Sequence, residues 1–315
     1  MRGPRVSVLI PCYNAEKYIG ETLESVFHQT WPDIEVIVVN DGSTDSSVDV
    51  VSRLGRPNLK LINQTNRGQT AALNTCIAYA SGDFIQYLDA DDVINPRKIE
   101  LQMSRLLQHP NCVASAEWGR FYDTVDRAKI DPEAVWRDLN PIDWFALSLA
   151  NGLGMMFPAL WLIPIRLVQA VGPWNETLTL ANDAEYFTRL LLAAEQVLFC
   201  PGARCYYRSG FSGSLSGRKS VSALESQYRV THLCEGYVRS REDSERIRRG
   251  FALSWQHFAH ASFPYCSELA ERALIRAQRL HPIRIRPEGG RAFHLAMRLI
   301  GWRLARRLQV ASGRP

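Results

Sequence analysis

The first 117 residues alternate apolar runs with amphipathic helical stripes, and this alternation restricts the chain to an α/β fold. Four mostly apolar runs predict strands at residues 6–10, 34–39, 59–62 and 84–88, and the first of them is rich in β-branched residues. Apolar residues at three- and four-residue spacing predict helices at 15–29, 45–54, 69–80 and from about 96 onward. The run at 34–39 is apolar almost throughout, which is typical of a parallel strand buried on both faces. We therefore predict a doubly wound, Rossmann-like, mostly parallel sheet with right-handed crossovers.

The chain after residue 117 is organised differently. Residues 118–182 are irregular and rich in tryptophan, and from about residue 220 the sequence is mainly helical and basic. A Ser- and Gly-rich stretch at 209–217 is typical of a linker. We expect one domain over residues 1–217, with halves at 1–117 and 118–217, followed by a helical C-terminal region over 218–315.

Positive charge is concentrated at the C-terminal end. Residues 272–315 contain eleven arginines, no lysine and one acidic residue, whereas the first 271 residues contain 26 basic and 31 acidic residues. We expect a single helix at 291–310 with one apolar and one basic face. The apolar face would carry Phe293, Met297, Ile300, Leu304 and Leu308, and the other Arg291, Arg298, Arg303, Arg306 and Arg307. Such a helix suits peripheral contact with an anionic membrane, and its periodicity equally suits packing on the body or on a second subunit of an oligomer. We expect no nucleic-acid partner.

Residues 144–165 form a 22-residue stretch without charge, which is long enough to raise the question of a membrane span. Asn151, Gly152, Pro158 and Pro164 interrupt it, so we interpret it as buried loop and strand. The apolar run that follows Arg5 is too short for a secretory signal. Seven cysteines without a CxxC pair fit a reducing compartment. We expect a cytoplasmic protein that works at, or near, the inner face of the membrane.

Polar residues follow each of the four expected strands. They are Pro11-Cys12-Tyr13-Asn14, Asn40-Asp41-Gly42-Ser43-Thr44-Asp45, Asn66-Arg67-Gly68 and Asp89-Ala90-Asp91-Asp92. Taken singly, each has an ordinary explanation as a turn, a helix cap or a solvated acidic loop. Together they lie where open parallel sheets bind ligands, beyond the carboxyl ends of the strands. Three crowded carboxylates repel one another, and a bound Mg²⁺ or Mn²⁺ would relieve that repulsion.

Several common nucleotide and hydrolase motifs are absent from the sequence. No GxGxxG follows the first expected strand, which disfavours a dinucleotide enzyme. No Walker A sequence and no GxSxG elbow occurs, which disfavours a P-loop nucleotidase and an α/β-hydrolase.

The motifs, in this order and spacing, resemble glycosyltransferase family 2. The resemblance spans roughly residues 5–217 and includes Gly172-Pro173-Trp174-Asn175-Glu176, Asn182-Asp183 and Arg189. It implies a GT-A fold, a nucleotide-sugar donor (a UDP-sugar above all), Mn²⁺ or Mg²⁺, and inversion at the anomeric carbon. It also implies a saccharide or lipid-linked acceptor, and a place in the synthesis of cell-surface polysaccharide or glycolipid.

The resemblance assigns roles to individual residues. Pro11 and Tyr13 would flank the nucleobase, Asp41 would accept a hydrogen bond from it, and Asp89 would face the ribose. Asp91, the last residue of a DXD motif, would bind the metal, and Asp183 would be the catalytic base. The full expected nucleotide-sugar site is Pro11, Tyr13, Asn14, Asp41, Arg67, Asp89, Ala90 and Asp91. The 118–217 half would hold the acceptor. Trp118 and the 144–165 segment would border it, because aromatic faces suit sugar rings and lipid chains, although tryptophans that only pack the core explain these residues equally well.

The sequence departs from the family pattern at two positions and leaves other functions open. Asn182 stands where the family often has Glu, so we expect the pKa of Asp183 to be tuned differently. No His follows Tyr207-Arg208, which predicts weaker metal binding. Asp183 could instead cap a helix, and Glu117 would then be the next candidate base. A sugar nucleotidyltransferase would release pyrophosphate. A non-catalytic sugar-nucleotide-binding protein would tolerate loss of Asp183.

Overall fold

The computed structural model describes residues 3–151, 154–210, 220–283 and 285–311. The chain divides into two compact units. The first comprises Met1–Trp144 and Met156–Ser214, and the second comprises Phe145–Met155 and Leu215–Pro315. The predicted domain boundary at 217/218 lies outside the described residues.

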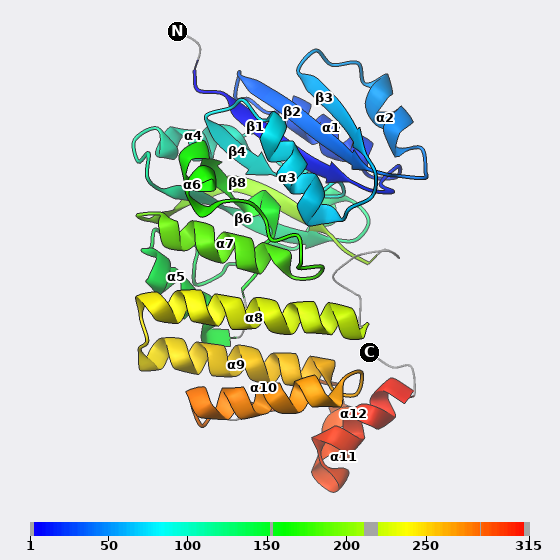
Figure 1. Cartoon of the computed structure of the whole chain (residues 1–315), viewed down its shortest axis with the longest axis vertical. Coiled ribbons are helices and arrows are strands. Elements are labelled where there is room, and N and C mark those ends of the chain that lie inside the picture. Colours follow the sequence, from blue (N-terminus) through cyan, green and yellow to red (C-terminus); the bar gives the residue numbers. More distant parts are fainter. Residues whose placement is uncertain (1–2, 152–153, 211–219, 284, 312–315) are drawn as a thin grey trace. The chain divides into compact units, whose positions relative to one another are not determined.

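The first unit is built on an eight-stranded sheet. Its strands are β1 (Val6–Cys12), β2 (Ile34–Asp41), β3 (Leu59–Gln64), β4 (Phe84–Tyr87), β5 (Val93–Ile94), β6 (Val113–Phe121), β7 (Leu162–Pro164) and β8 (Val197–Arg208). They lie in the order β3-β2-β1-β4-β7-β6-β8-β5. Figure 1 shows β3, β2, β1 and β4 in the upper part of the sheet. The pairs β1–β2, β1–β4, β2–β3 and β6–β8 are parallel, and β7 and β5 pair antiparallel with their neighbours. The predicted mostly parallel sheet is confirmed, and its antiparallel part comes from strands outside the predicted four.

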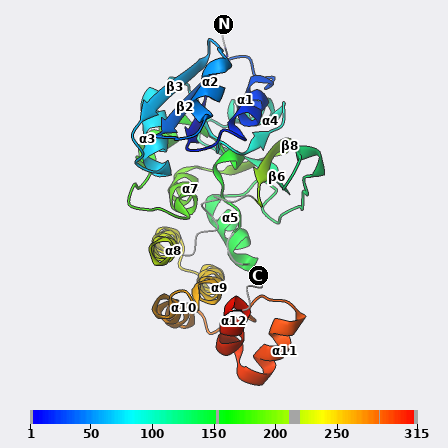
Figure 2. The same ribbon diagram turned by 90° about the vertical axis from the view of Figure 1, so that its right-hand side faces the viewer.

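Helices cover both faces of this sheet. They are α1 (Ile19–Phe27), α2 (Ser47–Arg53), α3 (Gln69–Tyr79), α4 (Lys98–Leu106), α6 (Ile165–Val171) and α7 (Asn182–Ala193). Figure 2 shows α3 and α7 on one face and α1, α2 and α4 on the other. All seven residues of β1 are buried. Of the apolar residues that predict the first helix, α1 buries Ile19, Leu23 and Val26, and Phe27 is half-buried. Burial on both faces explains why the central strands are apolar throughout rather than alternating.

The uncharged segment 144–165 is divided among several short elements. It contains the end of α5 (Pro141–Ser148), the 3₁₀ turns Leu149–Asn151 and Pro158–Leu160, and strand β7. Trp161 and Leu162 are buried in the core of the first unit. Within the described parts of the chain, no helix has the length and apolar character needed to cross a bilayer.

The second unit contains the C-terminal helices, as predicted. They are α8 (Val221–Arg241), α9 (Glu245–Ser262), α10 (Ser267–Leu280), α11 (Arg291–Ile300) and α12 (Trp302–Ala311). The first three lie side by side (Figures 1 and 2). Their core surrounds Trp255, which is fully buried and donates its indole N–H to the carboxylate of Glu235 at 2.7 Å.

The prediction of one helix at 291–310 is wrong. Gly301 has a φ of +77°, a conformation that glycine adopts without steric cost, and it separates α11 from α12. Phe293 is buried beneath the guanidinium of Arg306, whereas Leu304 and Leu308 are exposed on the second helix. The five apolar residues therefore do not form one continuous face, because the glycine interrupts the helical period.

Candidate active site

The loops that follow β1 and β2 are tied to each other at the carboxyl edge of the sheet. The backbone N–H of Asn14 donates to the hydroxyl of Ser43 at 3.0 Å, and the Asn14 side-chain oxygen accepts from the N–H of Thr44 at 2.8 Å. Asn14 has a positive φ of 48°, which asparagine tolerates better than most residues. Between these anchors Pro11 is buried and Tyr13 is 51% exposed, so the Tyr13 ring is available to a ligand.

Asp41 organises the loop that follows β3. Its carboxylate accepts hydrogen bonds from the backbone N–H groups of Arg67 and Gly68, at 2.9 and 2.8 Å, and from the side chain of Gln64 at 2.7 Å. The side chain is 3% exposed. Two oxygens can accept about four hydrogen bonds, so one acceptor position is left for a ligand.

Gly42 allows the β2 and β3 loops to approach closely. Its φ is +74°, and a Cβ atom there would lie 2.8 Å from the backbone nitrogen of Asn66. No larger residue fits without displacing one of the two loops. Asp41 thus accepts hydrogen bonds from the β3 loop, and glycine at position 42 lets the backbone N–H groups of that loop come close enough to donate them.

The acidic motif forms a tight turn at the end of β4. The N–H of Asp92 donates to the carbonyl of Asp89 at 3.2 Å, and the carbonyl of Ala90 accepts from the hydroxyl of Thr22 at 3.0 Å. Asp92 is fully buried, whereas Asp89 and Asp91 are half-buried at the edge. The turn therefore directs the carboxylates of Asp89 and Asp91 outward and that of Asp92 into the protein.

Asp183 lies in the first turn of α7. The N-cap position belongs to Ala181 and no side chain caps the helix, so Asp183 is not a capping residue. One carboxylate oxygen of Asp183 is buried and has no hydrogen-bond partner among the described residues. Burial raises the pKa of Asp183 to about 7. A carboxylate with that pKa can accept a proton near neutral pH and release it again.

Gln69 joins the acidic motif to α7. Its amide nitrogen donates to Asp89 at 2.9 Å, and its amide oxygen faces the Asn182 amide at 3.4 Å. The charge of Asp183 contributes to raising the pKa of Asp89, which means that the two carboxylates lie close together. Gln69 was not among the predicted site residues. Gln69 directly follows the Asn66-Arg67-Gly68 motif, and this position in the sequence could have identified it as a site residue.

An aromatic cluster fixes α7 against β4. The hydroxyls of Tyr87 and Tyr186 are hydrogen-bonded at 2.8 Å, and Tyr186 stacks on Trp174 with ring centroids 3.9 Å apart. Tyr87 meets the edge of Trp174 at 5.3 Å, and Phe187 packs against both. Since Tyr87 ends β4 and Tyr186 follows Asp183 by one helical turn, this contact sets the position of Asp183 relative to Asp89.

The carboxylates of this edge hold protons more tightly than ordinary aspartates. Burial is the largest cause for each, and it raises the pKa of Asp89, Asp91 and Asp92. Mutual repulsion adds to it, because the charge of Asp91 raises the pKa of both Asp89 and Asp92. Arg208 opposes the effect on Asp91 and Asp92. This edge of the sheet therefore carries more negative than positive charge.

Arg208 is the second residue that the sequence did not reveal as part of the site. It lies at the end of β8, is 7% exposed, and donates its backbone N–H to Asp92 at 3.0 Å and its Nε to the carbonyl of Asp91 at 2.8 Å. Its guanidinium also pairs with Glu21. The Tyr207-Arg208 pair was noted for the missing histidine, but its contact with the acidic motif depends on a strand pairing that the sequence does not predict.

The edge has the chemistry expected for a divalent cation that arrives with its ligand. Among the described residues, no group of three or more His, Cys, Asp or Glu side chains is arranged to hold a metal ion. Mg²⁺ in particular is often bound by one or two carboxylates, substrate phosphates and water rather than by a full protein cage. A buried oxygen of Asp92 and one of Asp183 have no partner among the described residues, and both fit a site that lacks a positive charge.

The remaining candidates have other contacts. Arg67 pairs with Glu176 at 3.0 Å, with both side chains about half exposed, so the pair is weak enough to open for a ligand. The Trp118 ring packs against Phe157, with ring centroids 5.8 Å apart. Glu117 pairs with Arg204 at 2.7 Å and accepts a backbone hydrogen bond from Gly202, so both of its carboxylate oxygens already have partners.

Comparison with known proteins agrees with the motif pattern. Residues 7–159 match the model of a family described as Glycosyl transferase family 2. An uncharacterized glycosyltransferase of Escherichia coli (strain K12), YibD, is 32% identical over 156 residues, which cover 47% of this chain and 44% of that protein. The hyaluronan synthase of Pasteurella multocida is 37% identical over 109 residues, which cover 34% of this chain and 11% of that protein. The chain spans less than half the length of these curated relatives.

Solved structures show the same architecture. The crystal structure of S. aureus TarS 1-349 in complex with UDP-GlcNAc has a TM-score of 0.73 and 19% sequence identity, and the likeness covers 98% of this chain and 92% of that chain. The likeness therefore includes both the sheet and the helical region. It shows the predicted GT-A fold.

The raised pKa of Asp92 predicts a measurable effect on stability. The folded state keeps a proton on Asp92 that the unfolded chain loses above pH about 4, so stability falls as the pH rises, by up to about 1.4 kcal/mol per pH unit for one group. Asp92→Asn mimics the protonated carboxyl and removes the pH-dependent loss of stability that Asp92 causes. We expect the free energy of unfolding, measured in urea from pH 5 to pH 8, to decline less steeply in the variant than in the wild type.

Asp45→Asn is the matched control. Burial alone would raise the pKa of Asp45, but hydrogen bonds from Ser47 and from backbone N–H groups outweigh it and lower the pKa. Asp45 therefore stabilises the fold above pH about 4, and its replacement should reduce stability at neutral pH. Parallel pH profiles for Asp92→Asn and the wild type would contradict the assignment.

Proposed function

The chain belongs to glycosyltransferase family 2 through residues 7–159, and we propose that it is an inverting, metal-dependent hexosyltransferase that uses a UDP-sugar. The observation that carries this proposal is Asp183, a half-buried carboxylate with a pKa of about 7 beside the acidic motif. Support for the donor comes from the shared fold with TarS, which was crystallised with UDP-GlcNAc. We assign donor binding and catalysis to residues 1–217 and a separate helical region to residues 218–315.

The loops at the carboxyl edge would bind the nucleotide. The exposed ring of Tyr13 and the neighbouring Pro11 would flank the base, and Asp41 would use its remaining acceptor position for a base N–H. Asp89 would face the ribose. Arg67 would exchange its surface pair with Glu176 for the diphosphate.

Asp91 would hold Mn²⁺ or Mg²⁺, together with oxygens of the diphosphate. The cation supplies positive charge where the leaving group becomes more negative. The protein's part is to keep the Asp91 carboxylate available at the edge, and the turn between Asp89 and Asp92 does this. Arg208 binds the carbonyl of Asp91 and thereby holds the turn in shape.

Asp183 would accept the proton of the acceptor hydroxyl. As the acceptor oxygen forms its bond to the anomeric carbon, its proton passes to Asp183, and the bond from that carbon to the diphosphate oxygen breaks. The electron pair of the broken bond leaves with the diphosphate. Attack from the face opposite the leaving group inverts the anomeric carbon, as in inverting glycoside chemistry.

Asp183→Asn tests the base. The amide keeps the shape but cannot accept the proton, so we expect turnover to fall about 10²–10⁴-fold while donor binding is retained. In the wild type, turnover should rise with pH through about 7, as Asp183 ionises.

The assay for Asp183→Asn measures release of the nucleoside diphosphate, because a nucleotidyltransferase would release pyrophosphate instead. The control is Asp126→Asn, at an exposed carboxylate. Wild-type turnover in Asp183→Asn would refute the assignment.

Asp91→Asn tests the metal site without relying on activity alone. In the wild type, Mn²⁺ with UDP should raise the melting temperature more at pH 8 than at pH 5.5, because protonated carboxylates bind metal poorly. Asp91→Asn should lose the Mn²⁺-dependent part of that shift and should also lose transfer. Full activity of the wild type in excess chelator would contradict a metal at this position.

We also place the chain at an anionic membrane surface, where it would use a saccharide or lipid-linked acceptor in cell-surface polysaccharide or glycolipid synthesis. The support comes from four exposed leucines, Leu295 and Leu299 on α11 and Leu304 and Leu308 on α12. Basic residues accompany them on these helices, and each arginine near an anionic leaflet contributes about 1 kcal/mol. Exposed apolar side chains next to arginines fit an interfacial helix. Trp118 remains our candidate for the acceptor border.

Vesicle flotation at low salt tests this placement. The wild type should float with anionic vesicles and much less with neutral ones, and added salt should weaken binding because it screens the arginines. Leu295→Glu combined with Leu299→Glu should abolish flotation, since the apolar contact is replaced by negative charge. Leu107→Glu, at an exposed leucine of the first unit, is the control. Equal recovery with neutral and anionic vesicles would contradict the proposal.

A further inference from the structure

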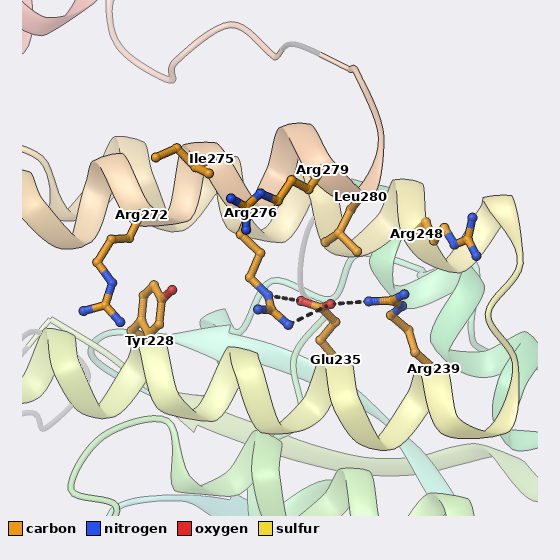
Figure 3. Close-up of a pocket in the computed structure, with 9 residues that line it drawn as sticks. All are labelled: Tyr228, Glu235, Arg239, Arg248, Arg272, Ile275, Arg276, Arg279 and Leu280. Atoms are coloured by element: carbon orange, nitrogen blue, oxygen red, sulfur yellow. Dashed lines mark hydrogen bonds and ion pairs between the residues drawn. The ribbon is translucent and has the colours of Figure 1, made fainter.

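A pocket of about 490 Å³ lies among α8, α9 and α10 (Figure 3). It is lined by five arginines, by the carboxylate of Glu235, and by the apolar surfaces of Tyr228, Ile275 and Leu280. This volume lies in the range of sites for small organic molecules. The pocket lies entirely within the second unit, so it is distinct from the acidic edge of the sheet.

Three of the five arginines form ion pairs with carboxylates of the bundle. Glu235 is 1% exposed and accepts from Arg276 at 2.6 Å and from Arg239 at 2.8 Å. Arg239 and Arg248 share Asp243, each at 2.7 Å. Figure 3 shows Glu235 between Arg276, which extends from α10, and Arg239, on its own helix. The two carboxylates are thereby satisfied within the bundle.

The other two arginines have no such partner. In the part of the chain that the structure describes, neither Arg272 nor Arg279 forms an ion pair, and both are exposed. They flank Arg276 on the same face of α10, at spacings of four and three residues. The guanidinium of Arg272 lies over the ring of Tyr228, 4.9 Å from its centroid. Five arginines against Glu235 and Asp243 leave three positive charges uncompensated.

We propose that this pocket binds a phosphate ester, whose anionic oxygens are held by Arg272 and Arg279 beside Arg276. The organic part of the ester would lie against Tyr228, Ile275 and Leu280. A guanidinium presents a planar fork of donors that matches phosphate oxygens, and like charges gathered in a concave surface attract anions.

The excess charge favours a phosphate over a carboxylate. A phosphate monoester carries about −1.5 to −2 charges at pH 7, whereas a carboxylate carries one, so the phosphate compensates more of the three excess charges. The same group occurs on soluble sugar phosphates and on phospholipid headgroups. Both sources share the chemistry that the arginines recognise, and the two are separated by the titration described next.

Calorimetric titration of the full chain tests the site. We expect glucose 6-phosphate or a water-soluble short-chain phosphatidic acid to bind, and the better of the two identifies the source. Glucuronate, which has a similar ring but a carboxylate, should bind at least tenfold more weakly. The double variant Arg272→Gln/Arg279→Gln should raise the Kd for the phosphate ester at least tenfold. Raising the salt concentration should also weaken binding.

The controls separate a local contact from a general effect of charge. Arg241→Gln/Arg249→Gln removes two exposed positive charges from the same unit outside the pocket, and it should bind as the wild type does. Circular dichroism and melting temperature should show that both double variants fold, since Arg272 and Arg279 form no ion pair in the described structure. Absence of binding to the wild type, equal weakening in both double variants, unchanged binding in Arg272→Gln/Arg279→Gln, or equal affinity for glucuronate would overturn the proposal.

Discussion

The organisation of the first unit depends on keeping four carboxylates close together at one edge of the sheet. Burial raises the pKa of all four, which are Asp89, Asp91, Asp92 and Asp183, and repulsion from neighbouring carboxylates raises the pKa of Asp89 and Asp92 further. The positive charge of Arg208 opposes this rise for Asp91 and Asp92. Such crowding destabilises a folded protein at neutral pH. A binding site for a cation and an anionic nucleotide gives a reason for it, because a ligand of that kind supplies the charges that the edge lacks.

Rigid packing behind the edge makes the crowding sustainable. The Tyr87–Tyr186 hydrogen bond and the stacked Trp174 form a buried cluster, which resists displacement by repulsion among the carboxylates of the edge. Arg189 reinforces it, since it pairs with Glu185 on α7 and donates to the carbonyls of Val171 and Pro173. The helix that carries Asp183 is thus held from both its buried face and its flank.

The sequence predicts the parts of this arrangement that are local. The four predicted strands form where the sequence has short, mostly apolar runs, and the polar residues after them meet because parallel strands end at one edge. Arg208 could not be found in this way, because it contacts Asp92, 116 residues away, through the return of β8 to the sheet. The single helix at 291–310 fails for a different reason. The helical spacing of its apolar residues continues across Gly301, but the positive φ of Gly301 ends the helix there. The assigned roles of Asp91 and Asp183 stay predictions.

Positive charge in the second unit has two separate functions in the structure. Arg239, Arg248 and Arg276 neutralise Glu235 and Asp243 and thereby join α8, α9 and α10. A buried carboxylate with several charge-assisted hydrogen bonds keeps its charge, and the pKa of Glu235 is lowered because these bonds outweigh the effect of burial. The number of arginines exceeds what this cross-linking requires. Arg272 also packs on the ring of Tyr228, but neither Arg272 nor Arg279 forms an ion pair among the described residues. The proposed phosphate ester would supply the negative charge that these two arginines lack.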